Sequence, residues 1–172
     1  YNGLTEIDPA IWRLNKLEKL NIANGKLKAF PERPDDILPQ DGLKALTDLE
    51  LYNCSYMEKF PDVVTTMPSL VSLNISNNKQ WSSEDINNGL KLLADGNSGA
   101  KLQILYMNEN RLTVVDGNDI AKMKSLGLLD LADNEIETVT PFGKDINIVQ
   151  LYLDNNRITE LKRGADGTFC GI

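Results

Sequence analysis

The chain has 172 residues, of which 41% are apolar and 25% are charged, and its 18 Lys and Arg against 25 Asp and Glu give a formal net charge of −7. This length fits one domain, and the apolar fraction argues against a disordered chain. The acidic balance argues against duplex nucleic acid and anionic membranes as partners, and the absence of histidine excludes every mechanism that needs an imidazole.

Six short strands are predicted by one recurring spacing of apolar residues. Each copy has apolar residues at positions 1, 4 and 6 and a small or polar residue at position 9. The copies begin at Leu17, Leu46, Leu70, Leu102, Leu126 and Ile148. Their ninth positions are Gly25, Cys54, Asn78, Asn110, Asn134 and Asn156. Successive copies start 22 to 32 residues apart, which leaves room for a strand and a return segment.

The recurring spacing has a physical explanation. Positions 4 and 6 alternate along a strand and point to one side, and a single repeat cannot bury that side alone. Stacked repeats bury it and form a parallel sheet. The chain then bends sharply, and a buried asparagine amide at position 9 can bond to the backbone groups of its own and neighbouring turns. Cys54 fits this place as a small buried donor. At Gly25 the turn is either shifted in register, with Asn24 as the substitute, or satisfied by water.

The return segments differ along the chain. Residues 2–14 have the pattern of the back half of a repeat, and residues 32–41 form an irregular insertion rich in Pro and Asp. A phenylalanine followed by proline comes after the first two bends, at residues 30–31 and 60–61. The longest return, residues 80–101, contains a predicted helix. It begins with a capping box of Ser82 and Asp85 and ends at Gly96. Its apolar positions at i, i+4 and i+7 are Ile86, Leu90 and Leu93.

The six copies resemble the leucine-rich-repeat pattern L-x-x-L-x-L-x-x-N/C-x-L, and the resemblance covers nearly the whole chain. It implies a right-handed α/β solenoid with a parallel sheet on the concave face and helices and irregular turns on the convex face. We expect residues 1–172 to form a single domain with truncated repeats at both ends. At the start, residues 2–14 match the back half of a repeat, and at the end Phe169 and Ile172 match the closing positions of a seventh return. The chain would then be part of a longer protein. Uneven repeat lengths and few cysteines resemble bacterial surface or secreted proteins, which favours an extracellular or cell-surface location.

No catalytic, cofactor or metal site is predicted. Cys54 and Cys170 are expected to be reduced, buried thiols, because strand stacking places them on the order of 20 Å apart, against a limit of roughly 7 Å for bridged Cα atoms. The acidic segments at residues 95–97, 116–119 and 133–135 do not complete a calcium-binding loop and are typical of turns. No apolar run approaches the ~18 residues of a membrane span, so we expect no membrane insertion.

The concave face is the predicted functional surface. Positions 2, 3, 5, 7 and 8 of the six repeats are not needed for the core, and they hold seven acids against one base. The candidate partner-binding residues are Asp48, Glu50, Tyr52, Asn74, Tyr106, Asn108, Asp130, Tyr152 and Asp154. Aromatic rings supply contact area and carboxylates steer a basic partner. The alternative interpretation is that parallel strands tolerate tyrosine and that these charges serve solubility alone.

The resemblance implies a non-enzymatic module that binds a protein or peptide on the concave face, with basic segments favoured by the acids. The same tyrosines, acids and amides also suit carbohydrate, so a carbohydrate-binding or adhesion module of a cell-surface protein is the alternative. A passive solenoid spacer is a third hypothesis. The small exposed area of six strands, of order 300 Å² from ~4.8 Å strand spacing and ~3.3 Å rise per residue, predicts weak binding by this segment alone.

Overall fold

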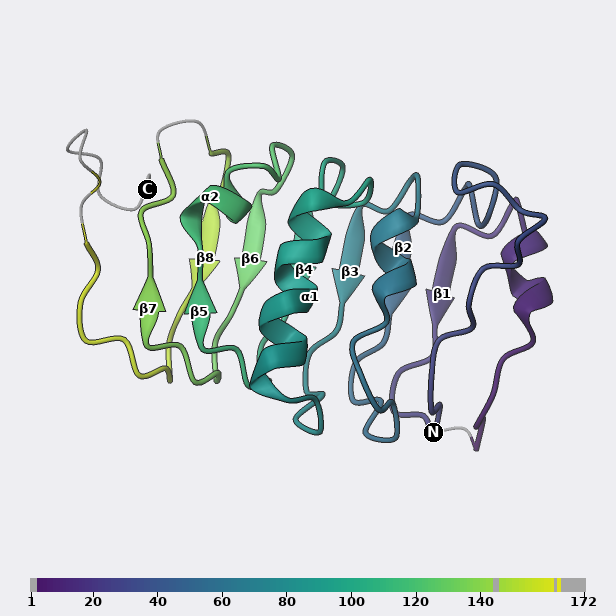
Figure 1. Cartoon of the computed structure of the whole chain (residues 1–172), viewed down its shortest axis with the longest axis horizontal. Helices are drawn as coiled ribbons and strands as arrows, with labels where there is room; N and C mark the ends of the chain where they lie inside the picture. The colour runs from purple at the N-terminus through teal and green to yellow at the C-terminus, as the bar shows by residue number, and fades with distance from the viewer. Residues whose placement is uncertain (1–2, 144–145, 163, 165–172) are drawn as a thin grey trace.

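The computed structural model describes residues 3–143, 146–162 and 164, and in this part of the chain the main element is a six-stranded parallel sheet. Its strands follow one another in chain order (Figure 1). They are β1 (Lys19–Asn21), β2 (Asp48–Glu50), β3 (Ser72–Asn74), β4 (Ile104–Tyr106), β6 (Leu128–Asp130) and β8 (Gln150–Tyr152). Every strand occupies positions 3 to 5 of one predicted repeat, so the predicted solenoid with a parallel sheet is confirmed.

The strands are in register at the leucine of position 4. Leu49 pairs with Leu73, Leu105 pairs with Leu129, and all four side chains are buried. The corresponding leucines of the outer strands, Leu20 in β1 and Leu151 in β8, are only partly buried, and within the described ranges each of these strands has a neighbour on one side only. Burial of position 4 therefore comes from stacking between repeats and not from any single repeat.

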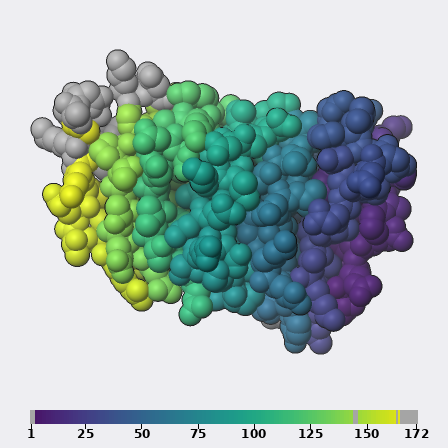
Figure 2. All heavy atoms as spheres, viewed as in Figure 1, coloured from purple at the N-terminus to yellow at the C-terminus, as the bar shows by residue number. Residues whose placement is uncertain are grey.

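The return segments form a second layer that covers one face of the sheet (Figure 1). Their elements are η1 (Pro9–Arg13), η2 (Asp62–Thr66), α1 (Ser83–Asp95), β5 (Val114–Val115), α2 (Gly117–Ile120) and β7 (Thr138–Val139). Figure 2 shows this layer as one packed surface on which the repeats follow each other in bands. The two-residue strands β5 and β7 pair in parallel, an element that the sequence analysis did not predict.

Helix α1 forms where the sequence predicts it. The Ser82 hydroxyl accepts a hydrogen bond from the Asp85 backbone N–H, and the Asp85 carboxylate accepts one from the Ser82 backbone N–H. The predicted capping box is therefore present. Gly96 ends the helix. The predicted inward face is also confirmed, since Ile86, Leu90 and Leu93 are buried. A helix on this return fills the space left by the longest interval between strands.

Two buried tryptophans anchor the second layer, and neither was singled out from the sequence. Trp12 packs edge-on against Phe30, with ring centroids 6.0 Å apart, and donates to the Pro31 carbonyl at 2.9 Å. Trp81 packs against Phe60 at 5.8 Å and donates to the Met57 carbonyl at 3.0 Å. Each indole therefore buries its ring and satisfies its N–H in the neighbouring repeat, which ties consecutive returns together.

The asparagines at position 9 form a ladder that joins each turn to the preceding repeat. Asn78 donates to the Ile75 carbonyl of its own turn at 2.9 Å and to the Leu51 carbonyl of the repeat before at 3.0 Å. Its side-chain oxygen accepts the backbone N–H of Cys54 at 2.8 Å. Asn110, Asn134 and Asn156 repeat the two donated bonds. The predicted bonding of the asparagine amide to its own and neighbouring turns is thus present.

The first two turns lack this asparagine. At position 9 of the second repeat, the Cys54 thiol lies 3.5 Å from the Ile22 carbonyl of the first repeat, as its predicted role requires. At the first turn, Asn24 has φ 57°, the left-handed conformation that position 8 adopts in every repeat, so the register is not shifted. The Asn24 side chain accepts from Asn53 at 2.9 Å and does not replace the missing side chain of Gly25.

Some predictions fall on residues that the structure does not describe. Phe169, Cys170 and Ile172 lie outside the described residues, so the predicted seventh return and the second thiol stay predictions. Within the described ranges, none of the helices combines the length and apolar character that crossing a bilayer requires.

We predict that Asn110→Ala lowers the free energy of unfolding by about 1 to 3 kcal/mol, because it leaves the Asn78 N–H without its acceptor in a buried turn and removes one of the two amide donors to the Ile75 and Met107 carbonyls. Chemical denaturation measures the change. The matched control is Asn108→Ala, which removes a half-buried amide from the same turn and should change stability by less than about 0.5 kcal/mol. Equal effects of the two variants would contradict the ladder.

We predict that Gly89→Ala destabilises the protein although alanine favours helix by about 1 kcal/mol. A Cβ at Gly89 would lie 2.6 Å from the Phe60 ring, and Trp81 holds that ring in place. Overpacking costs about 1 to 3 kcal/mol, so the net loss should be about 1 kcal/mol in thermal or chemical unfolding. Asn88→Ala, at the exposed neighbouring position of α1, should be neutral or slightly stabilising. A stabilised Gly89→Ala variant would show that α1 does not pack here as described.

Candidate functional site

The candidate site is the open face of the six-stranded sheet, defined as the side chains at positions 3, 5 and 7, opposite the second layer. In the strands, position 4 points into the core and its two neighbours point away from it. Register aligns these side chains in three rows. The position-3 row is Lys19, Asp48, Ser72, Ile104, Leu128 and Gln150. The position-5 row is Asn21, Glu50, Asn74, Tyr106, Asp130 and Tyr152. The position-7 row is Ala23, Tyr52, Ser76, Asn108, Ala132 and Asp154.

All nine predicted partner-binding residues lie in these rows. Asp48 is in the position-3 row, and five others are in the position-5 row. Tyr52, Asn108 and Asp154 follow in the position-7 row, where backbone bonds such as Asn53 N–H to the Ser76 carbonyl continue the register beyond the strands. The structure therefore brings together on one surface residues that are up to 106 positions apart in the sequence, from Asp48 to Asp154. Their binding role stays a prediction.

The acids at the β2 end of the face form a small network. Asp48 accepts from the Thr47 hydroxyl at 2.7 Å and lies 3.4 Å from the Lys19 ammonium. Glu50 lies beside it in the next row, where burial raises the pKa of its carboxyl, a hydrogen bond from Asn74 opposes the shift, and the Asp48 charge adds to it. The ionised form of Glu50 is thus held at some cost in the free protein.

Several side chains in the position-5 row also support the turn that follows their strand. Asn21, Asn74 and Asp130 each accept the backbone N–H two residues later, at 3.0 to 3.1 Å. This role was not identified from the sequence. The signal that could have found it is an Asn or Asp two residues before the tight bend, since such side chains commonly bond to backbone N–H groups nearby.

The acids at the other end of the face are crowded. Burial raises the pKa of the Asp130 carboxyl, its bond from the Ala132 N–H lowers it, and the charges of Asp154 and Asp133 raise it further. Among the residues that the structure describes, Asp130 takes part in no ion pair. The four acids of the three rows face a single base, Lys19, so this surface carries a negative field.

The middle of the open face carries an aliphatic pair that the sequence analysis did not single out. Ile104 in β4 and Leu128 in β6 lie directly opposite each other in the position-3 row, and both are half-buried. The remaining members of that row are polar or charged. Tyr106 follows Ile104 on the same side of β4. The signal was present as two apolar residues at a position where the other repeats have polar ones.

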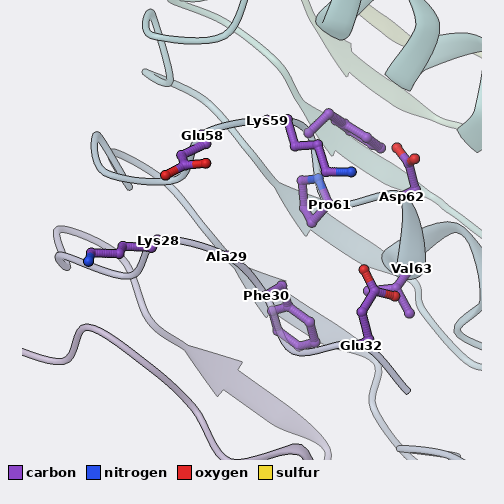
Figure 3. A pocket seen from close by; sticks show the side chains of 10 residues that line it. Lys28, Ala29, Phe30, Glu32, Glu58, Lys59, Pro61, Asp62 and Val63 are labelled. Carbon is purple, nitrogen blue, oxygen red and sulfur yellow. The ribbon is translucent and has the colours of Figure 1, made fainter. Parts of the chain in front are cut away.

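A hollow of about 340 Å³ lies on the opposite side of the molecule, between the first two returns. Figure 3 shows Phe30, Pro61 and Val63 around it, with Lys28 and Glu58 toward one end and Glu32 toward the other. Acids and bases alternate around its rim, so its charge selects no class of ligand.

Neither thiol chemistry nor metal chemistry is built into the described residues. Cys54 is free and buried, as predicted, and burial raises the pKa of its thiol, which leaves it protonated and unreactive. No group of three or more acidic or cysteine side chains in the described ranges is arranged to hold a metal ion.

Known proteins of similar structure and sequence share the repeat. A leucine-rich repeat protein from Bacteroides thetaiotaomicron superposes with a TM-score of 0.82 at 33% identity, over 93% of this chain and 21% of that one. A second, from Bacteroides eggerthii, gives 0.74 at 30% identity, over 87% and 27%. Podocan-like protein 1 of Homo sapiens is 26% identical over 90% of this chain and 36% of that protein. No protein-family model matches the chain.

An adenylate cyclase of Schizosaccharomyces pombe is 30% identical over 83% of this chain, but the match covers only 8% of that protein. The chain thus spans about a third or less of the length of these relatives. The leucine-rich-repeat fold of the two Bacteroides proteins is one that generally mediates interactions between proteins and is typically non-enzymatic.

We predict that Glu50→Gln stabilises the protein in a pH-dependent manner. Because the pKa of the Glu50 carboxyl is higher in the folded than in the unfolded state, the protonated carboxyl adds to the stability of the wild type at low pH. This contribution is lost as pH rises through the folded pKa. Below the unfolded pKa of about 4.3 the variant should match the wild type. At pH 7 it should be more stable, by less than about 1 kcal/mol because the side chain is only half-buried. Urea unfolding of both proteins across this range measures the difference, and a variant that becomes less stable relative to the wild type as pH rises would contradict the raised pKa of Glu50.

Proposed function

We propose that this chain, which belongs to the leucine-rich-repeat family, binds a protein partner on the open face of its six-stranded sheet. The observation that carries the proposal is the set of aligned rows on that face. They present three tyrosines and four acids, with one base, on a rigid surface whose geometry the sheet register fixes. We propose residues 1–172 as one binding domain without catalytic activity.

The chemistry of the face favours a basic partner. Glu50 and Asp130 are half-buried carboxyls whose pKa values are raised, so a cation from a partner would relieve an unfavourable charge at each of them. Tyrosine rings at Tyr52, Tyr106 and Tyr152 supply rigid contact area at low entropic cost. An interface of standard size buries about 800 Å² per partner, so we expect tight binding to use the turns beyond the strands as well.

Carbohydrate binding is the second candidate, and one observation favours it. Tyr106 and Asp130 are direct neighbours in the position-5 row, and an aromatic ring beside a carboxylate can pack on a sugar ring and accept from its hydroxyls. This alternative fits an adhesion role at a cell surface. A spacer role would leave the tyrosines and acids without a ligand.

Site-specific photocrosslinking tests the proposal. A benzophenone amino acid is placed at Tyr52 or Tyr106, and at Tyr56 as the control, an exposed tyrosine on the turn after β2. The labelled proteins are mixed with cell extract and with secreted proteins of the organism from which this protein comes. We expect a discrete protein adduct from Tyr52 and Tyr106 and not from Tyr56. Asp130→Asn with Asp154→Asn, or high salt, should reduce its yield several-fold.

Three outcomes would overturn the proposal. Adducts that form equally well from Tyr56 would place binding elsewhere. Binding to a glycan array that is lost in Tyr106→Ala, without a protein adduct, would favour carbohydrate. The absence of both would favour the spacer.

A further inference from the structure

We infer that Tyr106, Asp130 and Tyr152 form a subsite for an arginine side chain, and that Ile104 and Leu128 beside it take an aliphatic side chain two residues from that arginine in an extended partner segment. This inference rests on the proposed function, which it deepens by naming the partner's chemistry. The five residues are called the central subsite below.

The acid at the centre of the subsite lies between two aromatic rings. Asp130 pairs in register with Tyr106 on one side and with Tyr152 on the other, so the three occupy consecutive places in the position-5 row. The two tyrosines are therefore about 9.6 Å apart at their backbones, twice the strand spacing of about 4.8 Å. Tyr152 is 44% exposed and Tyr106 is half-buried, so both rings are open to a ligand.

This arrangement selects a planar cation. The guanidinium of arginine stacks on aromatic faces and forms paired hydrogen bonds with a carboxylate, whereas the lysine ammonium is a strongly hydrated point charge. The Asp130 carboxylate has one oxygen bonded to the Ala132 N–H, which fixes its orientation, and it has no cationic partner among the described residues. Asp133 and Asp154 nearby add to the negative charge.

The aliphatic pair fixes what lies beside the arginine. Ile104 and Leu128 are in the position-3 row, two residues before Tyr106 and Asp130 on the same strands. Two residues of strand rise about 6.6 Å, which equals the separation of side chains at i and i+2 in an extended peptide. A segment that lies along the strands can thus place an arginine on Asp130 and an aliphatic side chain on Ile104 and Leu128. In protein interfaces, the residues that contribute most to the binding free energy usually form an apolar core with a polar rim around it.

A phage library of random linear 12-residue peptides, selected on the immobilised protein, tests the inference. We expect the enriched peptides to carry arginine two positions from Leu, Ile, Val or Phe. Synthetic versions should bind at least about tenfold more weakly to Asp130→Asn, a variant that keeps the acceptor for the Ala132 N–H, and to Leu128→Thr. Replacing the arginine by lysine should weaken binding several-fold. The control is Glu137→Gln, an exposed acid just before β7 in the second layer and outside the open face, which should leave binding unchanged.

The outcomes separate this inference from the proposed function. Peptides without the arginine spacing, or peptides whose binding depends on Asp48 and Tyr52 but not on Asp130 or Leu128, would overturn the central subsite and leave the open face as a binding surface. If no selected peptide depends on any open-face residue, both fall. Cooperative unfolding of Asp130→Asn and Leu128→Thr well above the temperature of the binding assay would show that a loss of binding is not a loss of fold.

Discussion

The structure depends on one interaction, the hydrogen bonding of every sharp turn after the first to the repeat before it through the side chain at position 9. A bend of this kind leaves backbone groups that no strand can pair, and in the core they have no water. Asn78 satisfies them with one amide that reaches both its own turn and the preceding one. Because every asparagine of the ladder does the same, consecutive repeats are held at strand spacing and in one register, and the apolar side chains of positions 4 and 6 close into a continuous core.

The same constraint produces the candidate site. Register that aligns the buried leucines also aligns the outward side chains, so residues from six repeats meet in rows on the open face. Some of these side chains serve both purposes. Asp130 supports its own turn through the Ala132 N–H and also presents a charge between two tyrosines. Fold and site are therefore coupled. Variants such as Asp130→Asn, which keep an oxygen that accepts the Ala132 N–H, are the ones that separate binding from stability.

Features that repeat along the sequence could be predicted, whereas features made by neighbouring segments could not. The strands, the ladder and α1 follow from local spacing and capping residues, and the structure has them there. The pairing of β5 with β7 depends on how two returns approach each other, and the burial of Trp12 depends on Phe30 and Pro31 of the next return. At the site, the rows were predictable from strand alternation. The aliphatic pair Ile104 and Leu128 was not predicted, because the two residues are 24 positions apart in the sequence and become a pair only when β4 and β6 lie in register.

Native-state hydrogen exchange tests the central role of the ladder most directly. The backbone amides of Cys54, Asn78, Leu112 and Ile136 donate to the side-chain oxygen of an asparagine in the following repeat. Although they lie outside the regular strands, they should exchange as slowly as the strand amides of Leu73 and Leu105, because only the separation of repeats exposes them. Exchange of these turn amides at rates typical of exposed loops, with the strands still protected, would contradict the account.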